Sequence, residues 1–405
     1  MEKIIQPSAN IGIVGHVDHG KTTLTKLISG KWTDTHSEEI KRGITIKLGY
    51  SNFAIYKNKK TNKYELKKNK DNELINKYSI VDTPGHESLI ATMISGAAVM
   101  DCAILIISAD EECPQPQTRE HLKTLEISGI NNIIVIQNKI DLVTKEEAIE
   151  NYKQIKKFLK GTIAEKAPII PMSAEHGANL DILLKYIVDL FKIEKKEEDK
   201  EPLMYIIRSF DINKPGYKIE DIKGGIIGGT LKRGKLKKGD EIEIKPGIQS
   251  QKDGRETYTP IITEIKSISS GKDKLNKAKP GGSIAILTTL DPYLTKTDKL
   301  VGHLVGLKGT LPEPTNEITF ENKLLDKVIG TKEDFEVKPI IQNEVFMLII
   351  NSLKTVGIVK KTNPKETTVI LKKPVIIFDK DKVVIFRRFQ GNKWHIIGHG
   401  VIKVN

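Results

Sequence analysis

Hydrophobic and polar positions follow two different patterns along the chain, and the change falls near residue 200. Before it, short apolar runs alternate with longer stretches in which apolar residues recur every three or four positions. The short runs predict buried strands and the longer stretches predict amphipathic helices. The expected strands are 10–14, 78–82, 102–109, 132–137 and 169–172, and the expected helices are 21–29, 117–128, 145–159 and 179–191. This alternation predicts an α/β domain with a doubly wound, mostly parallel sheet.

The second half of the chain carries short β-branched runs separated by Gly, Pro and Asp clusters. Such runs with almost no helical periodicity predict all-β barrels. The charged stretch 192–201 (KIEKKEEDKE) before Pro202 is typical of a linker, and a second boundary is expected near 311–315. We therefore expect the α/β domain at 1–200, one β-barrel at 201–311 and a second at 312–405.

Composition narrows the class of protein. A chain of 405 residues exceeds what one core usually organises. Its 38% of hydrophobic residues, gathered in many apolar runs, excludes general disorder, and the two cysteines Cys102 and Cys113 exclude a disulfide-built scaffold. Since we find no apolar run near the ~18 residues of a membrane span and no signal-peptide core, we expect no membrane association and a cytoplasmic location.

The charge balance leaves two readings open. A formal net charge of +13 suits a polyanion such as RNA. General lysine enrichment explains it equally well, because only seven of the 65 basic residues are arginine, the side chain best suited to bidentate phosphate contacts. The segment 57–77 holds eight lysines and little apolar material, and we expect a solvated insertion or hairpin there.

The motif GHVDHGKT at 15–22 fits the GxxxxGK[ST] pattern between a predicted strand and a predicted helix. Its glycines let backbone N–H groups converge on phosphate oxygens at the helix N-terminus. We expect Lys21 to reach the β and γ phosphates and Thr22 to offer a hydroxyl to Mg²⁺. The motif therefore predicts a nucleotide phosphate site.

Three further motifs follow at predicted strand ends, where doubly wound sheets bind ligands. DTPG at 82–85 places the Asp82 carboxylate near the magnesium and the Gly85 N–H near the γ-phosphate. NKID at 138–141 supplies Asp141, whose carboxylate can accept hydrogen bonds from guanine N1 and N2. The pair Ser173-Ala174 offers a backbone N–H to guanine O6. Because adenine lacks that pair of donors, the motifs predict GTP rather than ATP.

Two residues between and after these motifs are candidates for the reaction. Thr45, in RGIT at 42–45, would complete the magnesium shell only while the γ-phosphate is present; otherwise it is a plain loop threonine. His86, directly after DTPG, would orient the attacking water; otherwise it is a solvent-facing histidine. No arginine is placed as a finger within the motifs, so we expect slow intrinsic hydrolysis, on the order of 10⁻⁴ to 10⁻² s⁻¹.

The stretches VGHVDHGKTTL, RGITI, VDTPGHE and NKID together resemble the translational GTPases of the elongation factor Tu group. The stretches RSFDINKPG, GGIIGGT, GLKGTLP, TVGIVKK and RRFQGNKWHIIGHG resemble, more narrowly, the gamma-subunit family of archaeal and eukaryotic translation initiation factor 2. The resemblance spans nearly the whole chain. It implies a GTP-binding domain followed by two β-barrels, in agreement with the hydrophobic pattern.

The resemblance also implies a function. Gamma subunits form the core of a heterotrimer, with the alpha subunit expected on the second domain and the beta subunit on the GTP-binding domain. In the GTP state the assembly carries methionylated initiator tRNA to the small ribosomal subunit, and hydrolysis to GDP releases it. The chain is thereby expected to be a GTPase that uses GTP, GDP and Mg²⁺.

The resemblance assigns site residues by position. The GTP site would comprise Val17, Asp18, His19, Gly20, Lys21, Thr22, Thr23, Asn138, Lys139, Asp141, Ser173 and Ala174. Magnesium would be held through Thr22, Thr45 and Asp82, with a second cation position at Asp18 and the Gly43 carbonyl. Catalysis would involve His86, Gly85, Asp82 and Thr45, with Val17 and Ile44 gating the approach of the histidine.

One departure from the family is plain. Relatives commonly carry a cysteine-rich zinc knuckle between the RGIT and DTPG motifs, whereas 57–77 contains no cysteine, and we predict no zinc. Three alternative functions remain at this point. They are an elongation-type factor resembling the selenocysteine-specific one, a GTP-binding assembly scaffold with little hydrolysis, and a metabolic GTPase of sulfate activation.

Overall fold

The computed structural model describes residues 6–32, 45–192, 196–214, 216–252, 255–329, 335–389 and 393–404. The chain divides into two compact units, Pro7–Lys195 and a second unit that joins Met1–Gln6 to Lys196–Asn405. The predictions for Gly43 and Ile44 lie outside the described residues. No helix within these described ranges is long and apolar enough to cross a membrane.

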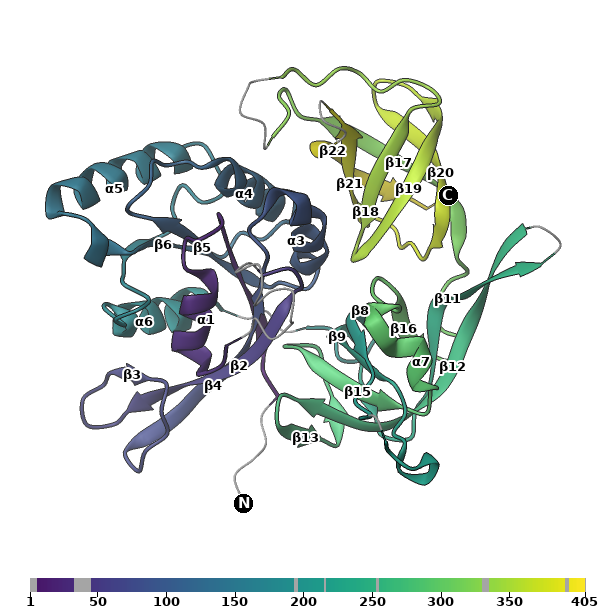
Figure 1. Ribbon diagram of the computed structural model, residues 1–405, viewed down its shortest axis with the longest axis horizontal. Helices are drawn as coiled ribbons and strands as arrows, with labels where there is room; N and C mark the ends of the chain where they lie inside the picture. Colours follow the sequence, from purple (N-terminus) through teal and green to yellow (C-terminus); the bar gives the residue numbers. More distant parts are fainter. Residues whose placement is uncertain are drawn as a thin grey trace. The chain divides into compact units, whose positions relative to one another are not determined.

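The first unit is built on a seven-stranded sheet in the order β3-β2-β4-β1-β5-β6-β7 (Figure 1). Strands β1, β4, β5, β6 and β7 run parallel, while β2 is antiparallel to both β4 and β3. The strands are β1 (Ala9–Gly15), β2 (Gly49–Asn58), β3 (Tyr64–Glu65), β4 (Asn72–Asp82), β5 (Cys102–Ser108), β6 (Ile133–Asn138) and β7 (Ile169–Pro171). The predicted doubly wound, mostly parallel sheet is confirmed.

Helices cover both faces of this sheet (Figure 1). They are α1 (Lys21–Ser29), α3 (Ile90–Ala97), α4 (Pro116–Ser128), α5 (Lys145–Leu159) and α6 (Leu180–Leu190), with 3-10 turns at Glu87–Leu89 and Ile140–Leu142. Apolar residues of α1 and α6 share one core with alternate residues of the strands. Every residue of β1 and β5 is buried, because helices pack on both sides of these central strands.

The structure adds two elements that the hydrophobic pattern did not predict. Strand β2 has an amphipathic alternation, yet its Tyr, Asn and Lys residues hide that pattern in the sequence. Helix α3 is apolar at nearly every position, so periodicity cannot distinguish it from a buried strand. The lysine-rich segment 57–77 forms a hairpin, in which β4 begins at Asn72 rather than at residue 78.

The first barrel of the second unit is a seven-stranded sheet in the order β11-β16-β8-β9-β15-β12-β13, closed by a β11–β12 pairing. Its strands are β8 (Leu203–Phe210), β9 (Ile226–Arg233), β11 (Glu241–Lys252), β12 (Arg255–Ser270), β13 (Asp273–Leu275), β15 (Ile284–Thr288) and β16 (Leu304–Leu307). Strands β10 (Leu236–Lys237) and β14 (Lys277–Ala278) form a separate pair. Helix α7 (Pro292–Thr295) and 3-10 turns at Ile219–Asp221 and Lys296–Asp298 lie in its loops.

The second barrel is closed, in the order β17-β20-β19-β18-β21-β22. Its strands are β17 (Thr315–Leu324), β18 (Val345–Ile350), β19 (Leu353–Thr362), β20 (Glu366–Val375), β21 (Lys382–Arg388) and β22 (Trp394–Lys403). Each barrel has its own apolar core. The predicted class, an α/β domain followed by two β-barrels, is confirmed.

Candidate nucleotide-binding site

The loop between β1 and α1 has the conformation that a phosphate-binding loop needs. Gly20 lies in the left-handed region at φ 95° directly before α1, and Asp18 has φ 59°. The Lys21 ammonium donates a hydrogen bond to the His16 carbonyl oxygen within the same loop. A Cβ atom at Gly20 would collide with the Asn138 side chain. The loop is therefore shaped by positions where only glycine fits comfortably.

A cavity of about 200 Å³ lies at this loop, and nine of its ten lining residues are predicted site residues. These nine are Val17, Asp18, Gly20, Lys21, Thr22, Thr23, Thr45, Gly85 and His86. The tenth, Trp32, was not predicted as a site residue, because it lies outside the four GTP-binding motifs. Its indole is half-exposed and lies 5.3 Å from the Lys26 ammonium.

Two threonine hydroxyls meet at the cavity. Thr22 Oγ1 of α1 and Thr45 Oγ1 lie 3.2 Å apart although 23 residues separate them in the chain. Asp82, at the end of β4, is fully buried. Hydroxyl and carboxylate oxygens are the hard ligands that Mg²⁺ prefers, and it retains several waters besides. The residues at this point therefore fit a magnesium ion held jointly with nucleotide phosphates.

Gly85 lies against the phosphate-binding loop so closely that no side chain fits. A Cβ there would touch the Lys21 ammonium and would lie 2.9 Å from Val17 N and 3.0 Å from Gly15 O. The turn before it is fastened to β1, because Thr83 N and Oγ1 donate to the Ile13 carbonyl oxygen at 3.3 and 2.7 Å. The Gly85 backbone is thus held close against the phosphate-binding loop.

His86 lines the cavity from an exposed position in the turn that follows Gly85. Its Nδ1 lies 2.9 Å from Ser88 Oγ, and the Ser88 backbone N–H donates to the same nitrogen at 3.3 Å. These contacts direct Nδ1 toward the chain. The Nε2 atom is therefore the nitrogen that can serve a water at the phosphate.

Asn138 joins the two halves of the site. Its Nδ2 donates to the His19 carbonyl oxygen at 2.8 Å, and its Oδ1 accepts from the Ala174 N–H at 2.9 Å. The side chain is 2% exposed. Asn138, predicted as a guanine-reading residue, has its carboxamide engaged with backbone on both sides in this structure. It positions the phosphate-binding loop relative to the Ser173-Ala174 turn.

Asp141 lies at the base-recognition end. Hydrogen bonding from the Ser173 side chain lowers the pKa of the Asp141 carboxyl below its usual value, so the carboxylate is ionised near neutral pH. An ionised carboxylate is the acceptor that the guanine N1–H and N2–H groups require. Lys139, in the left-handed region at φ 61°, forms an ion pair with Asp110 at 3.2 Å.

Two buried histidines support the phosphate-binding loop. His19 is fully buried; its Nδ1 lies 3.0 Å from the Ile106 carbonyl oxygen and its Nε2 lies 3.3 Å from Glu111. Burial lowers the pKa of His19 to about 4. His121 of α4, which the sequence reasoning missed, accepts a hydrogen bond from the Gly15 N–H at 2.8 Å, and burial lowers its pKa as well. Both rings are therefore neutral near pH 7.

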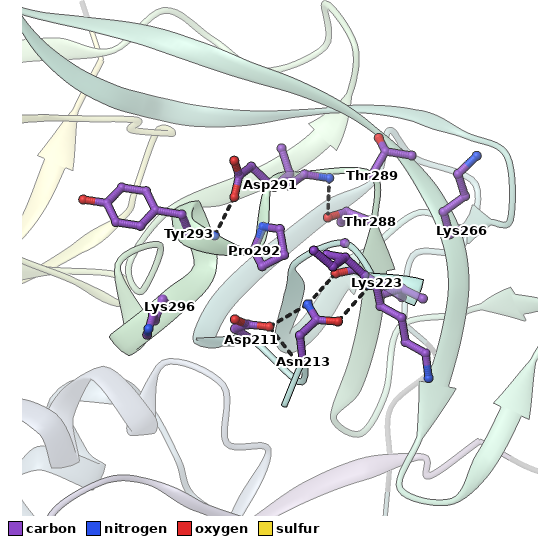
Figure 2. A pocket seen from close by; sticks show the side chains of 14 residues that line it. Asp211, Asn213, Lys223, Lys266, Thr288, Thr289, Asp291, Pro292, Tyr293 and Lys296 are labelled. Atoms are coloured by element: carbon purple, nitrogen blue, oxygen red, sulfur yellow. Dashed lines mark hydrogen bonds between the residues drawn. The ribbon is translucent and has the colours of Figure 1, made fainter. Parts of the chain in front are cut away.

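The first barrel contains a larger cavity, of about 930 Å³, which no motif predicted. Figure 2 shows Lys223 and Lys266 on one side of it and Lys296 on the other. Apolar lining comes from Ile222, Leu287, Leu290, Pro292 and Tyr293. We name it the first-barrel cavity. It combines lysine ammonium groups with an apolar wall.

Hydrogen bonds fix the loop that borders the first-barrel cavity. Asn213 Oδ1 accepts from Lys223 N at 2.8 Å, and its Nδ2 donates to Lys223 O at 2.7 Å (Figure 2). Asn213 is itself held by Asp211, whose Oδ1 accepts from the Asn213 backbone and side chain. A Cβ at Gly224 would collide with the Thr288 carbonyl oxygen. The loop therefore lies tightly against β15.

Both cysteines and two of the barrel arginines take structural roles. Cys102 is buried in β5 and Cys113 is a half-buried loop thiol. Arg208 pairs with Asp298, and Arg387 pairs with Glu344, each within its own barrel. Within the described residues, no three His, Cys, Asp or Glu side chains gather as a metal-binding group.

The α/β domain with its phosphate-binding loop, followed by two barrels, defines a GTPase of the translation-factor class. Residues 6–193 match the elongation factor Tu GTP binding domain family, 224–299 match elongation factor Tu domain 2, and 316–402 match the family of initiation factor eIF2 gamma, C terminal. Translation initiation factor 2 subunit gamma of Methanococcus vannielii is 51% identical over 98% of both chains, and that of Methanocaldococcus jannaschii is 51% identical over the same shares. The chain belongs to the family of gamma subunits of translation initiation factor 2, and it is a translation initiation GTPase.

The fold also occurs in a solved elongation factor. The crystal structure of translation elongation factor SelB from Methanococcus maripaludis with the GTP analogue GppNHp superposes with a TM-score of 0.74. The two chains are 24% identical, and the match covers 99% of this chain and 80% of SelB. At this identity the likeness concerns the fold alone.

Proposed function

We propose that this GTPase carries methionylated initiator tRNA to the small ribosomal subunit while GTP is bound, and releases it after hydrolysis. Two observations support the proposal: the contact between the Thr22 and Thr45 hydroxyls in the α/β domain, and a lysine-lined cavity in the first barrel. Membership of the gamma-subunit family makes translation initiation the process in which this carriage would take place.

The nucleotide state would be sensed through Thr45. Thr22 and Thr45 would hold Mg²⁺ through their hydroxyls, with Asp82 behind them orienting a metal-bound water. When bound, Mg²⁺ neutralises charge on the β and γ phosphates. Gly85 would donate its backbone N–H to the γ-phosphate, and loss of that phosphate would release both Gly85 and Thr45.

Hydrolysis would rely on His86. Its ring can accept a hydrogen bond from water and orient the oxygen toward the γ-phosphate, the role that glutamine has in other GTPases. The second cation position at Asp18, and the assignment of Asp141 and the Ala174 N–H to guanine, belong to the same proposal. Because the Ala174 N–H donates to Asn138 Oδ1, guanine O6 would share that hydrogen with the Asn138 carboxamide. Asn138 contributes by holding the loop and the base-recognition turn together.

The first-barrel cavity would accept the methionylated 3′ end of the tRNA. Its volume, about 930 Å³, lies at the upper end of the range for small-ligand pockets, which suits an adenosine bearing an amino acid. The methionyl thioether chain and the base would pack on the wall formed by Leu287, Leu290 and Pro292. Lys223 and Lys266 would face the phosphates that precede the terminal adenosine.

The test compares the binding of three tRNAs: methionylated initiator tRNA, uncharged initiator tRNA and methionylated elongator tRNA. Each is measured with the GTP-loaded and the GDP-loaded chain, in the presence of an alpha subunit from a relative and at fixed salt. We expect the charged initiator to bind the GTP form at least about tenfold more tightly than the GDP form. Equal affinity for the initiator and elongator tRNAs would contradict the proposal, and would favour an elongation-type role.

A variant pair tests the cavity itself. Lys223→Gln with Lys266→Gln removes two charges from the cavity, and we expect the affinity for charged tRNA to fall about tenfold. Lys237→Gln with Lys238→Gln removes two exposed charges at the end of β10 in the same unit and serves as the matched control. Equal losses in both variants would show that only the overall charge matters, and would exclude the cavity as the binding site.

The relatives are named as gamma subunits, and we propose that this chain likewise assembles with alpha and beta subunits of the same factor. The alpha subunit would bind the first barrel and the beta subunit the α/β domain. The assembly would act in the cytoplasm, where the small ribosomal subunit engages messenger RNA. Co-purification of the chain with each separately tagged subunit tests these contacts, and failure of both to bind would contradict them.

A further inference from the structure

We propose that the segment 57–77, here called the lysine hairpin, is a docking surface for RNA phosphates, and that the Glu65 carboxylate organises it. This inference rests on the established family activity in translation initiation and does not depend on tRNA carriage by the first-barrel cavity. It assigns a partner class to a part of the molecule that lies outside the GTP site.

The lysine hairpin concentrates positive charge. It contains eight lysines and three acidic residues, a net +5 out of +13 for the whole chain. Six of these lysines are exposed: Lys59, Lys60, Lys63, Lys67, Lys68 and Lys70. Two exposed ion pairs, Lys59–Glu73 at 3.8 Å and Lys60–Asp71 at 2.9 Å, use two of the acidic groups. The surface therefore retains a strong positive potential.

The hairpin is anchored to the α/β domain. Strands β2 and β4 pair through Lys57–Glu73 and Asn58–Asn72, and β3 pairs with β2 through Tyr56–Glu65. Tyr64 and Leu66, on either side of Glu65, pack against the domain core. Figure 1 shows β3 at the edge of the sheet beside β2. The lysines therefore project from a fixed scaffold, which lowers the entropy lost on binding.

Glu65 joins the loops that carry the lysines. Its Oε1 accepts from Asn58 Nδ2 at 3.1 Å, and its Oε2 accepts from Asn69 Nδ2 at 3.2 Å and Asn72 Nδ2 at 2.9 Å. Asn58 and Asn72 flank the two loops, 59–63 and 66–71, and Asn69 lies within the second loop. One carboxylate thus holds together, through charge-assisted hydrogen bonds, the segments that present six ammonium groups.

The chemistry favours RNA backbone over bases. Tyr64 is the only aromatic residue in the hairpin, and because it packs against the core it is not a platform for base stacking. Lysines act as point charges that neutralise phosphates without reading sequence. A partner with regularly spaced phosphates, such as a ribosomal RNA helix, matches this surface. An acidic protein is the alternative that the experiment must separate.

The first experiment removes charge. Lys63→Gln, Lys67→Gln and Lys70→Gln are combined in the full chain, and binding to a short RNA duplex is measured over a range of salt. The slope of log affinity against log salt should fall by about 2 to 3, since each phosphate contact contributes about 0.9. GTP hydrolysis should stay unchanged. The control combines Lys156→Gln, Lys157→Gln and Lys160→Gln, exposed lysines of α5 and the residue after it.

Two outcomes would overturn the charge part of the proposal. One is an equal change of slope in the hairpin variant and the α5 control, which would mean that RNA senses only the net charge. The other appears when polyglutamate replaces the duplex. If the hairpin variant loses polyglutamate binding but keeps duplex binding, the surface serves an acidic protein instead.

The second experiment separates organisation from charge. Glu65→Ala and Glu73→Ala each remove one negative charge from the hairpin. By charge alone, both should strengthen RNA binding. We expect Glu73→Ala to do so, whereas Glu65→Ala weakens binding about threefold or more and accelerates amide exchange within 57–77.

Glu65→Gln keeps the shape of the side chain and one acceptor oxygen, so it is the variant that disturbs folding less. The affinity for GTP shows whether the domain is intact in each variant. It should give an intermediate affinity for the duplex. If Glu65→Ala and Glu65→Gln both strengthen RNA binding as Glu73→Ala does, with unchanged amide exchange, Glu65 does not organise the surface.

Discussion

The nucleotide-binding site and the first-barrel cavity are built in different ways. The nucleotide-binding site is formed mainly by loop backbone. At Gly20 and Gly85 a side chain would collide with neighbouring atoms, and Thr83 holds the turn against β1. In the first-barrel cavity, side chains supply the lining, and Lys223, Lys266 and Lys296 come from three separate segments.

The difference explains why one site is visible in a sequence and the other is not. A backbone site needs glycines at fixed spacing, which leaves a motif. A side-chain site needs only suitable groups brought together by the fold, and these leave no pattern. The same difference predicts how substitutions act: they should disturb the nucleotide site sharply and the cavity gradually.

The largest expected effect is on the reaction. His86→Ala should lower GTP hydrolysis between about 100-fold and 10,000-fold, because it removes the group that orients water, and leave GTP affinity nearly intact. Binding of charged tRNA in the GTP state should not change, since His86 is not among the residues lining the first-barrel cavity. Single-turnover hydrolysis measures the rate, with Ser88→Ala as the control for the local turn. An unchanged rate would remove His86 from the mechanism.

Next in size is the loss of the Asn138 bridge. Asn138→Ala leaves two buried backbone groups, His19 O and Ala174 N, without that partner, so GTP and GDP affinity should both fall about 100-fold. Asn10→Ala is the matched control, since Asn10 is equally buried and bonds Val99 O at the far end of β1. Titration with a fluorescent nucleotide measures both. A similar loss in the control would mean that general destabilisation, not the bridge, sets affinity.

Acid should weaken the α/β domain through His19. Its pKa is about 4 in the folded chain, below the ordinary 6.5, so the unfolded chain binds the proton more readily as pH falls. Above about pH 6.5 His19 does not lower the free energy of unfolding. At pH 5 its protonation in the unfolded chain should lower that free energy by about 2 kcal/mol. Hydrogen exchange of β1 amides reports it, and His19→Asn should reduce the response without abolishing it, because the buried His121 contributes in the same direction. The first barrel has a histidine of its own, His303, whose pKa is also lowered by burial, although no histidine lines the first-barrel cavity.

The smallest effect separates the two nucleotides. Thr45→Ala should lower GTP affinity about tenfold and leave GDP affinity within about twofold, because the Thr45 hydroxyl would join Thr22 on the metal only with a γ-phosphate. Charged tRNA binding should fall only in step with GTP occupancy. Equilibrium binding of both nucleotides checks this, and an equal loss for GDP would make Thr45 a structural residue.

Sequence reasoning reached the nucleotide site because its residues follow strand ends in motif order. Thr22, Thr45 and Gly85 are predicted from three separate motifs, and the structure brings all three to one cavity. His121 escaped prediction, since its hydrogen bond to Gly15 depends on how α4 packs beside β1, and periodicity says nothing about that contact.

The two barrels show a different limit of prediction from the sequence. Alternating β-branched runs predict strands, but the closure of β11 against β12 depends on pairings between distant segments. Asn213 and Lys223 are ten residues apart in the chain, and the Asn213 carboxamide holds them together by bonding the Lys223 backbone. An asparagine is common in loops, so nothing in the sequence distinguishes this one. The first-barrel cavity could therefore be found only in three dimensions.

The bridge made by Asn138 has a consequence for how the chain changes nucleotides. One side chain holds both the loop that surrounds the phosphates and the turn that meets the base. The two ends of a bound nucleotide therefore cannot loosen one after the other while this carboxamide keeps both bonds. We therefore expect GDP to dissociate through a single concerted opening of both ends.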